Sequence, residues 1–216
     1  ELGPTMADIA RAKAGIIKEG GDVVIYGGNP EADPVFEEVC AQRSAKLHKA
    51  DFSAIVPGPF GLDGQSFSYG AWKDLQIPLV GVYQMRNAAV VLETVQVLRG
   101  KGWHISDAAV ASGLKNTRWP ARFEVLRRDP VFIVDGGHNP HGIRATAESL
   151  QRLFPGKKFT FVTGVMADKD VESILGLIVP LADQFFTVSG SIAAFLFLIC
   201  CSYPAGIKTQ LLSFQH

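Results

Sequence analysis

Apolar positions in the first part of the chain recur with the spacing of short helices and strands. Residues 5–14 have helical spacing, with Thr5 as a suitable N-cap and Gly15 as a suitable stop. The run at 22–26 is a short apolar strand, and residues 32–45 return to helical spacing. This region therefore predicts a helix, a strand and a second helix.

Residues 46–80 follow a different pattern, in which short β-like runs alternate with Gly and Pro. Such a pattern is typical of a small set of strands and turns. Residues 84–99 then predict a long amphipathic helix, and residues 106–113 a helix opened by a serine cap. The block 116–121 contains Pro120, which interrupts any helix, and predicts a linker between domains.

The second half of the chain alternates strands and helices. Strands are expected at 131–134, 158–163 and 184–188, with helices at 140–154 and 169–181. This alternation predicts a parallel α/β sheet. Residues 189–216 carry almost no charge and do not repeat the pattern, so they are expected to form a divergent tail.

Composition is that of a globular chain of one large or two small domains. The 216 residues are 47% hydrophobic and 19% charged, and the 21 Lys and Arg balance the 21 Asp and Glu. The balance argues against a general nucleic-acid or anionic-membrane surface. Three cysteines without metal-ligand spacing favour a reduced, cytoplasmic protein. The apolar run 192–201 has about half the length that a membrane-spanning helix needs, so no membrane association is expected.

The candidate chemistry gathers after the apolar run 131–134, which ends in Asp135, two glycines, His138 and Asn139. Ligands of α/β domains bind outside the carboxyl ends of strands, where glycines let the backbone approach them. Asp135 offers an acceptor and His138 a titratable donor or acceptor. A plainer interpretation is equally open: the turn ends a strand, and Asn139 caps the next helix.

Four segments, in order, resemble the folylpolyglutamate synthases and the bifunctional dihydrofolate/folylpolyglutamate synthases of the Mur ligase superfamily. They read LGPTMADIARAKAGIIKEG, GVYQMRNAAVVLETVQVL, RWPARFE with VDGGHNPHG, and FTFVTGVMADKDVESIL. The resemblance implies an α/β fold: the C-terminal part of a Mur-ligase-type ATP domain, then a Rossmann-like C-terminal domain, truncated. The expected ranges are 1–117 for the ATP domain, 118–188 for the C-terminal domain and 189–216 for the tail.

The resemblance also implies an activity. ATP phosphorylates the terminal carboxylate of a folate, and the amino group of L-glutamate attacks the acyl phosphate to give an amide. The implied cofactors are ATP and Mg²⁺, and the implied partners are folate and L-glutamate, with no nucleic acid or membrane, in a monomeric protein.

Five residues match the family's functional positions. Lys13 matches a lysine that is carbamylated, so that it acts as a carboxylate near magnesium; otherwise it is a surface lysine at a helix C-terminus. Asn87 matches the asparagine beside adenine; otherwise it is a polar residue in the first turns of a helix. Arg122 matches an arginine that reaches the nucleotide phosphates. Asp135 and His138 match a pair near the ribose and phosphates.

The chain departs from the family in several places. Ala121 stands where Gly is usual, and Tyr83 stands where many members have His. The phosphate loop G-x-x-G-K-[ST] is absent from the sequence, as are the upstream magnesium ligands. We therefore expect a fragment with little or no ligase activity alone. Two rival functions remain open: a Mur-type amino-acid ligase of cell-wall synthesis, and a catalytically dead nucleotide-binding fragment.

Overall fold

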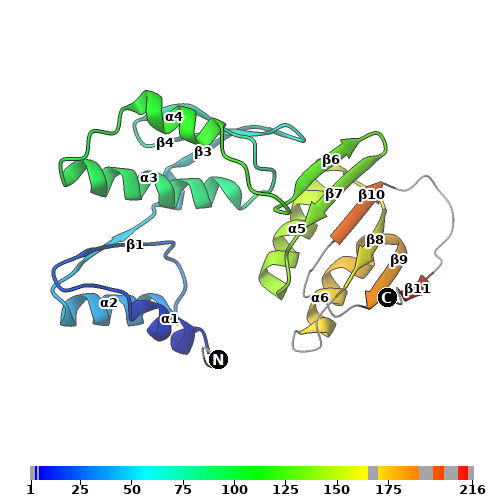
Figure 1. Ribbon diagram of the computed structural model, residues 1–216, viewed down its shortest axis with the longest axis horizontal. Helices are drawn as coiled ribbons and strands as arrows, with labels where there is room; N and C mark the ends of the chain where they lie inside the picture. Colours follow the sequence, from blue (N-terminus) through cyan, green and yellow to red (C-terminus); the bar gives the residue numbers. More distant parts are fainter. Residues whose placement is uncertain (1–2, 4, 165–169, 190–196, 202–208, 214–216) are drawn as a thin grey trace. The chain divides into compact units, whose positions relative to one another are not determined.

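The residues of the chain group into two compact units in the computed structural model (Figure 1). The structure describes residues 3, 5–164, 170–189, 197–201 and 209–213. Unit 1 comprises Glu1–Pro57, Phe67–Leu75 and Met85–Leu114, and unit 2 comprises Gly58–Ser66, Gln76–Gln84 and Lys115–His216. Both units draw on several stretches of the chain, so the expected domain boundaries near residues 117 and 188 stay a prediction.

The first helix of unit 1 begins and ends where the sequence predicts. Helix α1 spans Met6–Ala14, with Thr5 as N-cap and Gly15 as C-cap. The Asp8 N–H donates to Thr5 Oγ1 at 3.1 Å, and the Thr5 N–H donates back to Asp8 Oδ2 at 3.2 Å. This reciprocal capping box satisfies two backbone groups that a helix start otherwise leaves without partners.

Two parallel strands and a helix follow in unit 1. Strands β1 (Asp22–Ile25) and β2 (Lys46–Lys49) pair in parallel, and helix α2 (Asp33–Gln42) connects them. Cys40 of α2 is buried in a small apolar cluster with Ala14 and Ile17. The expected strand and helix are therefore confirmed, each a little shorter than predicted.

The region of short runs forms a three-stranded sheet, and two helices follow it. Strands β3 (Ile55–Gly61), β4 (Gly64–Tyr69) and β5 (Trp72–Ile77) pair in the order β3-β4-β5. Helix α3 spans Gln84–Gly100 and α4 spans Asp107–Lys115. The Ala109 N–H donates to the Ser106 hydroxyl at 3.1 Å, which confirms the serine cap. Residues 116–121 are irregular, as expected of a linker.

Unit 2 is built on a six-stranded sheet whose order is β11-β9-β8-β10-β7-β6. Its elements are β6 (Glu124–Arg128), β7 (Val131–Asp135), α5 (Pro140–Leu153), β8 (Phe159–Thr163), α6 (Val171–Ile178), β9 (Ala182–Ser189), β10 (Phe197–Cys201) and β11 (Thr209–Ser213). Buried apolar side chains of β7, α5, β8, α6 and β9 form its core. The alternating pattern of the second half therefore produces an α/β unit, as expected.

The prediction of a parallel sheet is wrong in part. Strand β8 pairs in parallel with β9, and β9 with β11, but β6–β7, β7–β10 and β10–β8 are antiparallel. Strand β6 precedes β7 by a two-residue connection, which can only join antiparallel neighbours. Strand β10 lies between β7 and β8, a pairing that no local pattern in the sequence indicates.

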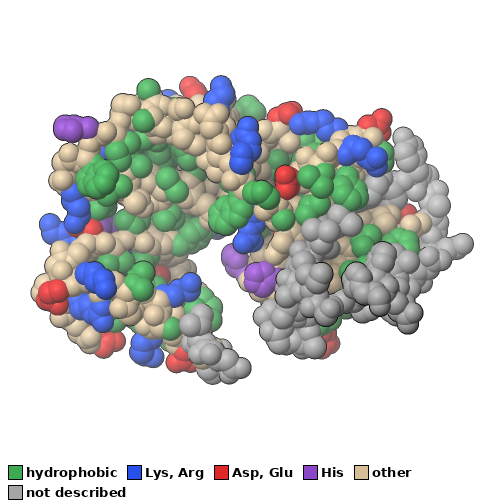
Figure 2. All heavy atoms as spheres, in the orientation of Figure 1, with side chains coloured by type: hydrophobic (Ala, Val, Ile, Leu, Met, Phe, Trp, Pro, Cys, Tyr) green, Lys and Arg blue, Asp and Glu red, His purple; other side chains and the backbone are tan. Residues whose placement is uncertain are grey.

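Strand β10 gives the structure of part of the apolar run at 192–201. Residues 197–201 of this run form a strand, whereas 192–196 lie outside the described residues. Within the described part of the chain, no helix has both the length and the apolar character needed to cross a bilayer. On the face shown in Figure 2, Lys and Arg side chains lie among Asp and Glu side chains, without a large patch of one sign.

Candidate functional site

Asp135 ends strand β7 and organises the turn that follows it. The residue is 2% exposed. Its Oδ2 accepts the Phe123 N–H at 2.8 Å and its Oδ1 accepts the Gly137 N–H at 2.6 Å. Burial raises the pKa of this carboxyl, while the Gly137, Phe123 and Thr146 hydrogen bonds and the charge of Arg122 oppose the rise. Because both of its oxygens accept backbone N–H groups, Asp135 holds the turn together, and its expected place near the nucleotide stays a prediction.

A second turn, Ala121–Phe123, is bound directly to the first. The Gly136 N–H donates to the Ala121 carbonyl at 2.7 Å, which adds to the bond between Phe123 and Asp135. Ala121 and Phe123 both adopt left-handed backbone conformations, with φ of 55° and 48°. These two bends project Arg122 between two anchored residues. The family's usual Gly at position 121 has a clear reason, since glycine adopts positive φ without cost from a Cβ.

Arg122 is half-buried, and its guanidinium is held from one side by an aromatic ring. It lies 5.1 Å from the centroid of the Trp119 ring, a cation–π contact. Both residues line a pocket of about 240 Å³ within unit 2. A guanidinium that is always charged and held in place by a ring is a suitable partner for a phosphate or carboxylate.

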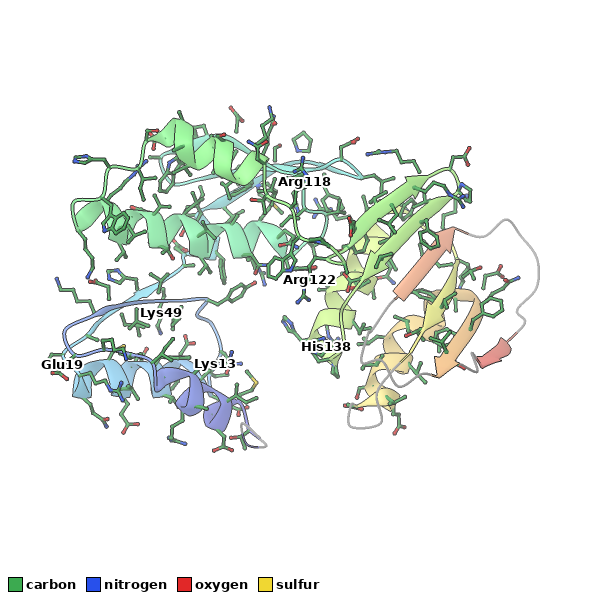
Figure 3. All side chains as sticks on the ribbon, in the orientation of Figure 1. Lys13, Glu19, Lys49, Arg118, Arg122 and His138 are labelled. Carbon is green, nitrogen blue, oxygen red and sulfur yellow. The ribbon has the colours of Figure 1, made fainter. Side chains whose placement is uncertain are left out.

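His138 lies at the same end of unit 2, where β7 ends and α5 begins (Figure 3). Its side chain is exposed, and its Nδ1 lies 3.1 Å from the Gly136 carbonyl oxygen. Asn139 is the N-cap of α5, because its Oδ1 accepts the Gly142 N–H at 2.8 Å, and Pro140 occupies the first turn. The helix cap predicted for Asn139 is therefore confirmed. This role of Asn139 is compatible with a binding site at the neighbouring residues. The start of a helix carries partial positive charge, which favours an anion beside Arg122 and His138.

The other two candidates, Lys13 and Asn87, belong to unit 1. Lys13 is exposed in the last turn of α1, where a cation interacts favourably with the helix dipole (Figure 3). Asn87 lies in the first turns of α3 and is half-buried. The structure thus brings together Arg122, Asp135 and His138, while Lys13 and Asn87 are described only in their own unit.

No magnesium site is formed by the described residues alone. Among them, no group of three or more His, Cys, Asp or Glu side chains is arranged to hold a metal ion. Asp135 already accepts backbone hydrogen bonds with both oxygens. The arrangement can bind an anion through Arg122, but it does not fit a metal by itself.

Two residues of this cluster were not assigned a role from the sequence. Trp119 stacks on Arg122. The sequence holds a signal for this contact, because Trp119 lies three positions before the arginine in the same turn. Tyr83 lies near Arg122 and Asp135, and its pKa is raised to about 12, chiefly by burial and then by the Asp135 charge, against the Arg122 charge. Tyr83 is distant from Arg122 in sequence, so no local signal could have found it.

Comparison with known proteins identifies the family. Residues 121–195 match the family model described as Mur ligase, glutamate ligase domain. The chain is 37% identical over 175 residues to the folylpolyglutamate synthase of Lacticaseibacillus casei, covering 78% of this chain and 41% of that protein. A solved FPGS–AMPPCP–folate complex superposes with a TM-score of 0.78 at 32% identity, covering 88% of this chain and 48% of that one.

A further solved structure is similar along most of this chain. The folylpolyglutamate synthase of Mycobacterium tuberculosis complexed with ADP gives a TM-score of 0.75 at 28% identity, and the match covers 90% of this chain and 45% of that one. The chain thus spans less than half the length of the relatives that it matches. The expected α/β architecture of a Mur-type ligase is confirmed. The chain belongs to the Mur ligase superfamily, in the group of folylpolyglutamate synthases and bifunctional dihydrofolate/folylpolyglutamate synthases.

Proposed function

We propose that this protein acts in an ATP-dependent ligase that adds L-glutamate to folate. The names of its relatives support this proposal, as does the similarity to a complex that contains both AMPPCP and folate. The same names favour folate polyglutamylation over a cell-wall amino-acid ligase. A cytoplasmic location and a monomeric state belong to the proposal as well.

The observation that carries the proposal is the anchored turn of Arg122. One backbone hydrogen bond, from Gly136 to Ala121, and one from the Phe123 N–H to the Asp135 side chain tie the two turns together, and Trp119 supports the Arg122 guanidinium. A cation fixed in this way beside a helix start suits the phosphates of a nucleotide. Arg122 is therefore assigned to the phosphates, Asp135 to holding the turn and His138 to the ribose and phosphate region.

In the proposed reaction, the folate carboxylate takes the γ-phosphoryl group of ATP and ADP leaves. The glutamate amine then attacks the acyl carbon, the C–O bond to phosphate breaks, and an amide, phosphate and a proton result. Arg122 would hold phosphate oxygens as their charge develops, which lowers the barrier most when the cation is already in position. Asn87 would contact the adenine, and Lys13, if carbamylated, would supply a carboxylate near the reacting groups.

Magnesium belongs to the proposed reaction as a cofactor that offsets phosphate charge. The described residues do not form a site for it, so we derive no step through the metal. Its ligands would have to come from elsewhere in the complete ligase, with Lys13 as the candidate contribution from this chain.

Titration calorimetry with ADP tests the nucleotide assignment. We expect the chain to bind ADP, and Arg122→Ala to weaken binding by about 10- to 100-fold, because a hydrogen bond to a charged group contributes about 1.5–3 kcal/mol. Arg127→Ala is the matched control: this arginine is exposed on β6 and donates to the Pro130 carbonyl. Equal affinity of wild type and Arg122→Ala would contradict the assignment.

A second measurement separates a ligase from a fragment that only binds nucleotide. We expect the isolated chain to bind ADP without adding glutamate to folate, because the phosphate loop is absent from its sequence. ATP-dependent formation of folate diglutamate by this chain alone would show that the expectation of inactivity is wrong.

A further inference from the structure

The loop before helix α3, residues 79–83, is held by a buried side chain of strand β4. Gln65 is 6% exposed, and its Nε2 donates to the Leu79 carbonyl at 2.9 Å and to the Gly81 carbonyl at 2.7 Å. Both hydrogens of the amide are used on two carbonyls of one loop. The backbone of residues 79–81 is thereby fixed from the side of β4.

The same loop is held from helix α5. The Val82 N–H donates to Ser149 Oγ at 3.2 Å, and Ser149 is fully buried, with its own hydroxyl donated to the Ala145 carbonyl at 2.7 Å. Between the two anchors, Gly81 has a φ of 130°, and a Cβ there would lie 2.8 Å from the Tyr83 ring. The Leu79 and Gly81 carbonyls and the Val82 N–H are therefore all held by hydrogen bonds. This fixes the backbone that leads into Tyr83.

The 79–83 loop reaches the candidate site through Leu79 and Val80, which line the same pocket as Trp119 and Arg122. The charges of Asp135 and Arg122 also act on the Tyr83 phenol, since the first raises its pKa and the second lowers it. A shift of the loop would change what packs beside Arg122.

We propose that Gln65 is a positioning residue for the nucleotide, which acts on the orientation of Arg122 through the 79–83 loop that lines the Arg122 pocket. This inference rests on the proposed nucleotide role of Arg122. Gln65 itself contacts no reacting group; it holds the Leu79 and Gly81 carbonyls and so fixes the loop that lines the Arg122 pocket.

The chemistry at position 65 requires an amide. Two carbonyl acceptors need two hydrogens on one nitrogen, which glutamine supplies and a carboxylate cannot. The remaining amide oxygen, Oε1, is buried and has no hydrogen-bond partner among the described residues. The amide orientation follows from these contacts, because the reversed orientation would set Oε1 against two carbonyl oxygens. Keeping this oxygen without a partner is the cost of holding the loop.

Two variants and a matched control test the inference. Gln65→Met keeps the length of the side chain and removes both donors, and Ser149→Ala removes the acceptor on the other side of the loop. Gln76→Met makes the same chemical change at an exposed position of β5. The indole N–H resonance of Trp119 in nuclear magnetic resonance spectra reports the stacked Arg122 without ligand, and ADP titration reports affinity. Circular dichroism establishes that each variant is folded.

We expect Gln65→Met to move the Trp119 resonance and to weaken ADP binding by about fivefold or more, with a smaller change in Ser149→Ala and none in Gln76→Met. A folded Gln65→Met protein that keeps both the resonance and the affinity overturns the inference. Lower stability with unchanged affinity would also overturn it, because it would show a purely structural glutamine.

Failure of the proposed nucleotide role gives a different result. In that case wild type and Arg122→Ala would bind ADP equally or not at all. The Trp119 resonance of Gln65→Met would then still decide whether the loop positions Arg122: a moved resonance supports the link, and an unmoved one refutes it. If Gln65→Met does not fold, Ser149→Ala carries both measurements.

Discussion

Ala121 shows at the scale of one residue how this chain departs from its family. Its φ of 55° lies in the left-handed region, where a Cβ crowds the following carbonyl oxygen. The turn nevertheless keeps this conformation, because the Ala121 carbonyl accepts the Gly136 N–H and the Ala121 N–H donates to Glu124 Oε2 at 2.8 Å. The protein therefore holds a strained residue next to its principal candidate cation.

Replacing Ala121 by glycine should stabilise the protein. Relief of about 1–2 kcal/mol of left-handed strain is partly offset by about 0.5–1 kcal/mol of extra backbone entropy, so we expect a net gain of about 0.5–1 kcal/mol. Denaturant unfolding measures this difference. Ala145→Gly, within α5 of the same unit, should instead lose about 1 kcal/mol. A loss in both variants would show that Ala121 is not strained.

Short family motifs in the sequence indicated which residues of unit 2 lie together. The strings around Arg122, Asp135 and His138 indicated residues that the structure gathers at one end of unit 2, although their roles stay predictions. The sequence did not indicate that Asp135 faces the protein interior, since burial and hydrogen bonding depend on the neighbouring turn. Tyr83 was noted only as a departure from the family, and Gln65 was missed, because their contacts join segments far apart in sequence.

The elements of the fold that have strong local signals are those that the sequence predicts well. Helix α1 begins at its Thr5 cap, and α5 begins at its Asn139 cap. Strands β2 and β6 have weak signals, since KLHK and EVLRR are short and rich in charge. Their pairing comes from tertiary contacts, which override local preference in strands more than in helices.

The Asn139 cap contributes to the stability of unit 2 and to the geometry of its candidate site. Asn139→Ala removes the acceptor for the Gly142 N–H, and we expect a loss of about 1 kcal/mol in the free energy of unfolding. Asn139→Asp keeps an acceptor in place and should remain within a few tenths of a kcal/mol of wild type. Chemical denaturation of the three proteins distinguishes a cap from a residue that matters only through its side-chain volume.

Several aspartate carboxyls among the described residues share one direction of pKa shift. Lys101 and then His48 lower the pKa of Asp22, and Arg99 and then Trp72 lower that of Asp107. A carboxyl whose folded pKa is lowered stabilises the protein above its unfolded pKa, near 3.9, and this contribution is lost as the pH falls. Asp135 has the opposite sign: burial raises its pKa, so the folded protein loses stability as the pH rises and this carboxyl ionises.

Stability should therefore fall as the pH drops below about 4. In Asp22→Asn the loss between pH 7 and pH 3 should be smaller than in wild type, because one of the lowered carboxyls is gone. In Asp135→Asn the loss should be larger, because the group that gains from protonation is gone. Unfolding by denaturant at several pH values measures these slopes. Parallel pH profiles for all three proteins would contradict the assigned shifts.

Strand β10 has a consequence for the order in which this protein acquires its structure. Because β10 lies between β7 and β8, the two earlier strands cannot complete their hydrogen bonds until Phe197–Cys201 has left the ribosome. During synthesis, each presents an unpaired edge, which is the feature of a nascent chain that most invites pairing with a neighbour. The middle of the sheet is therefore completed only after most of its other strands have been made.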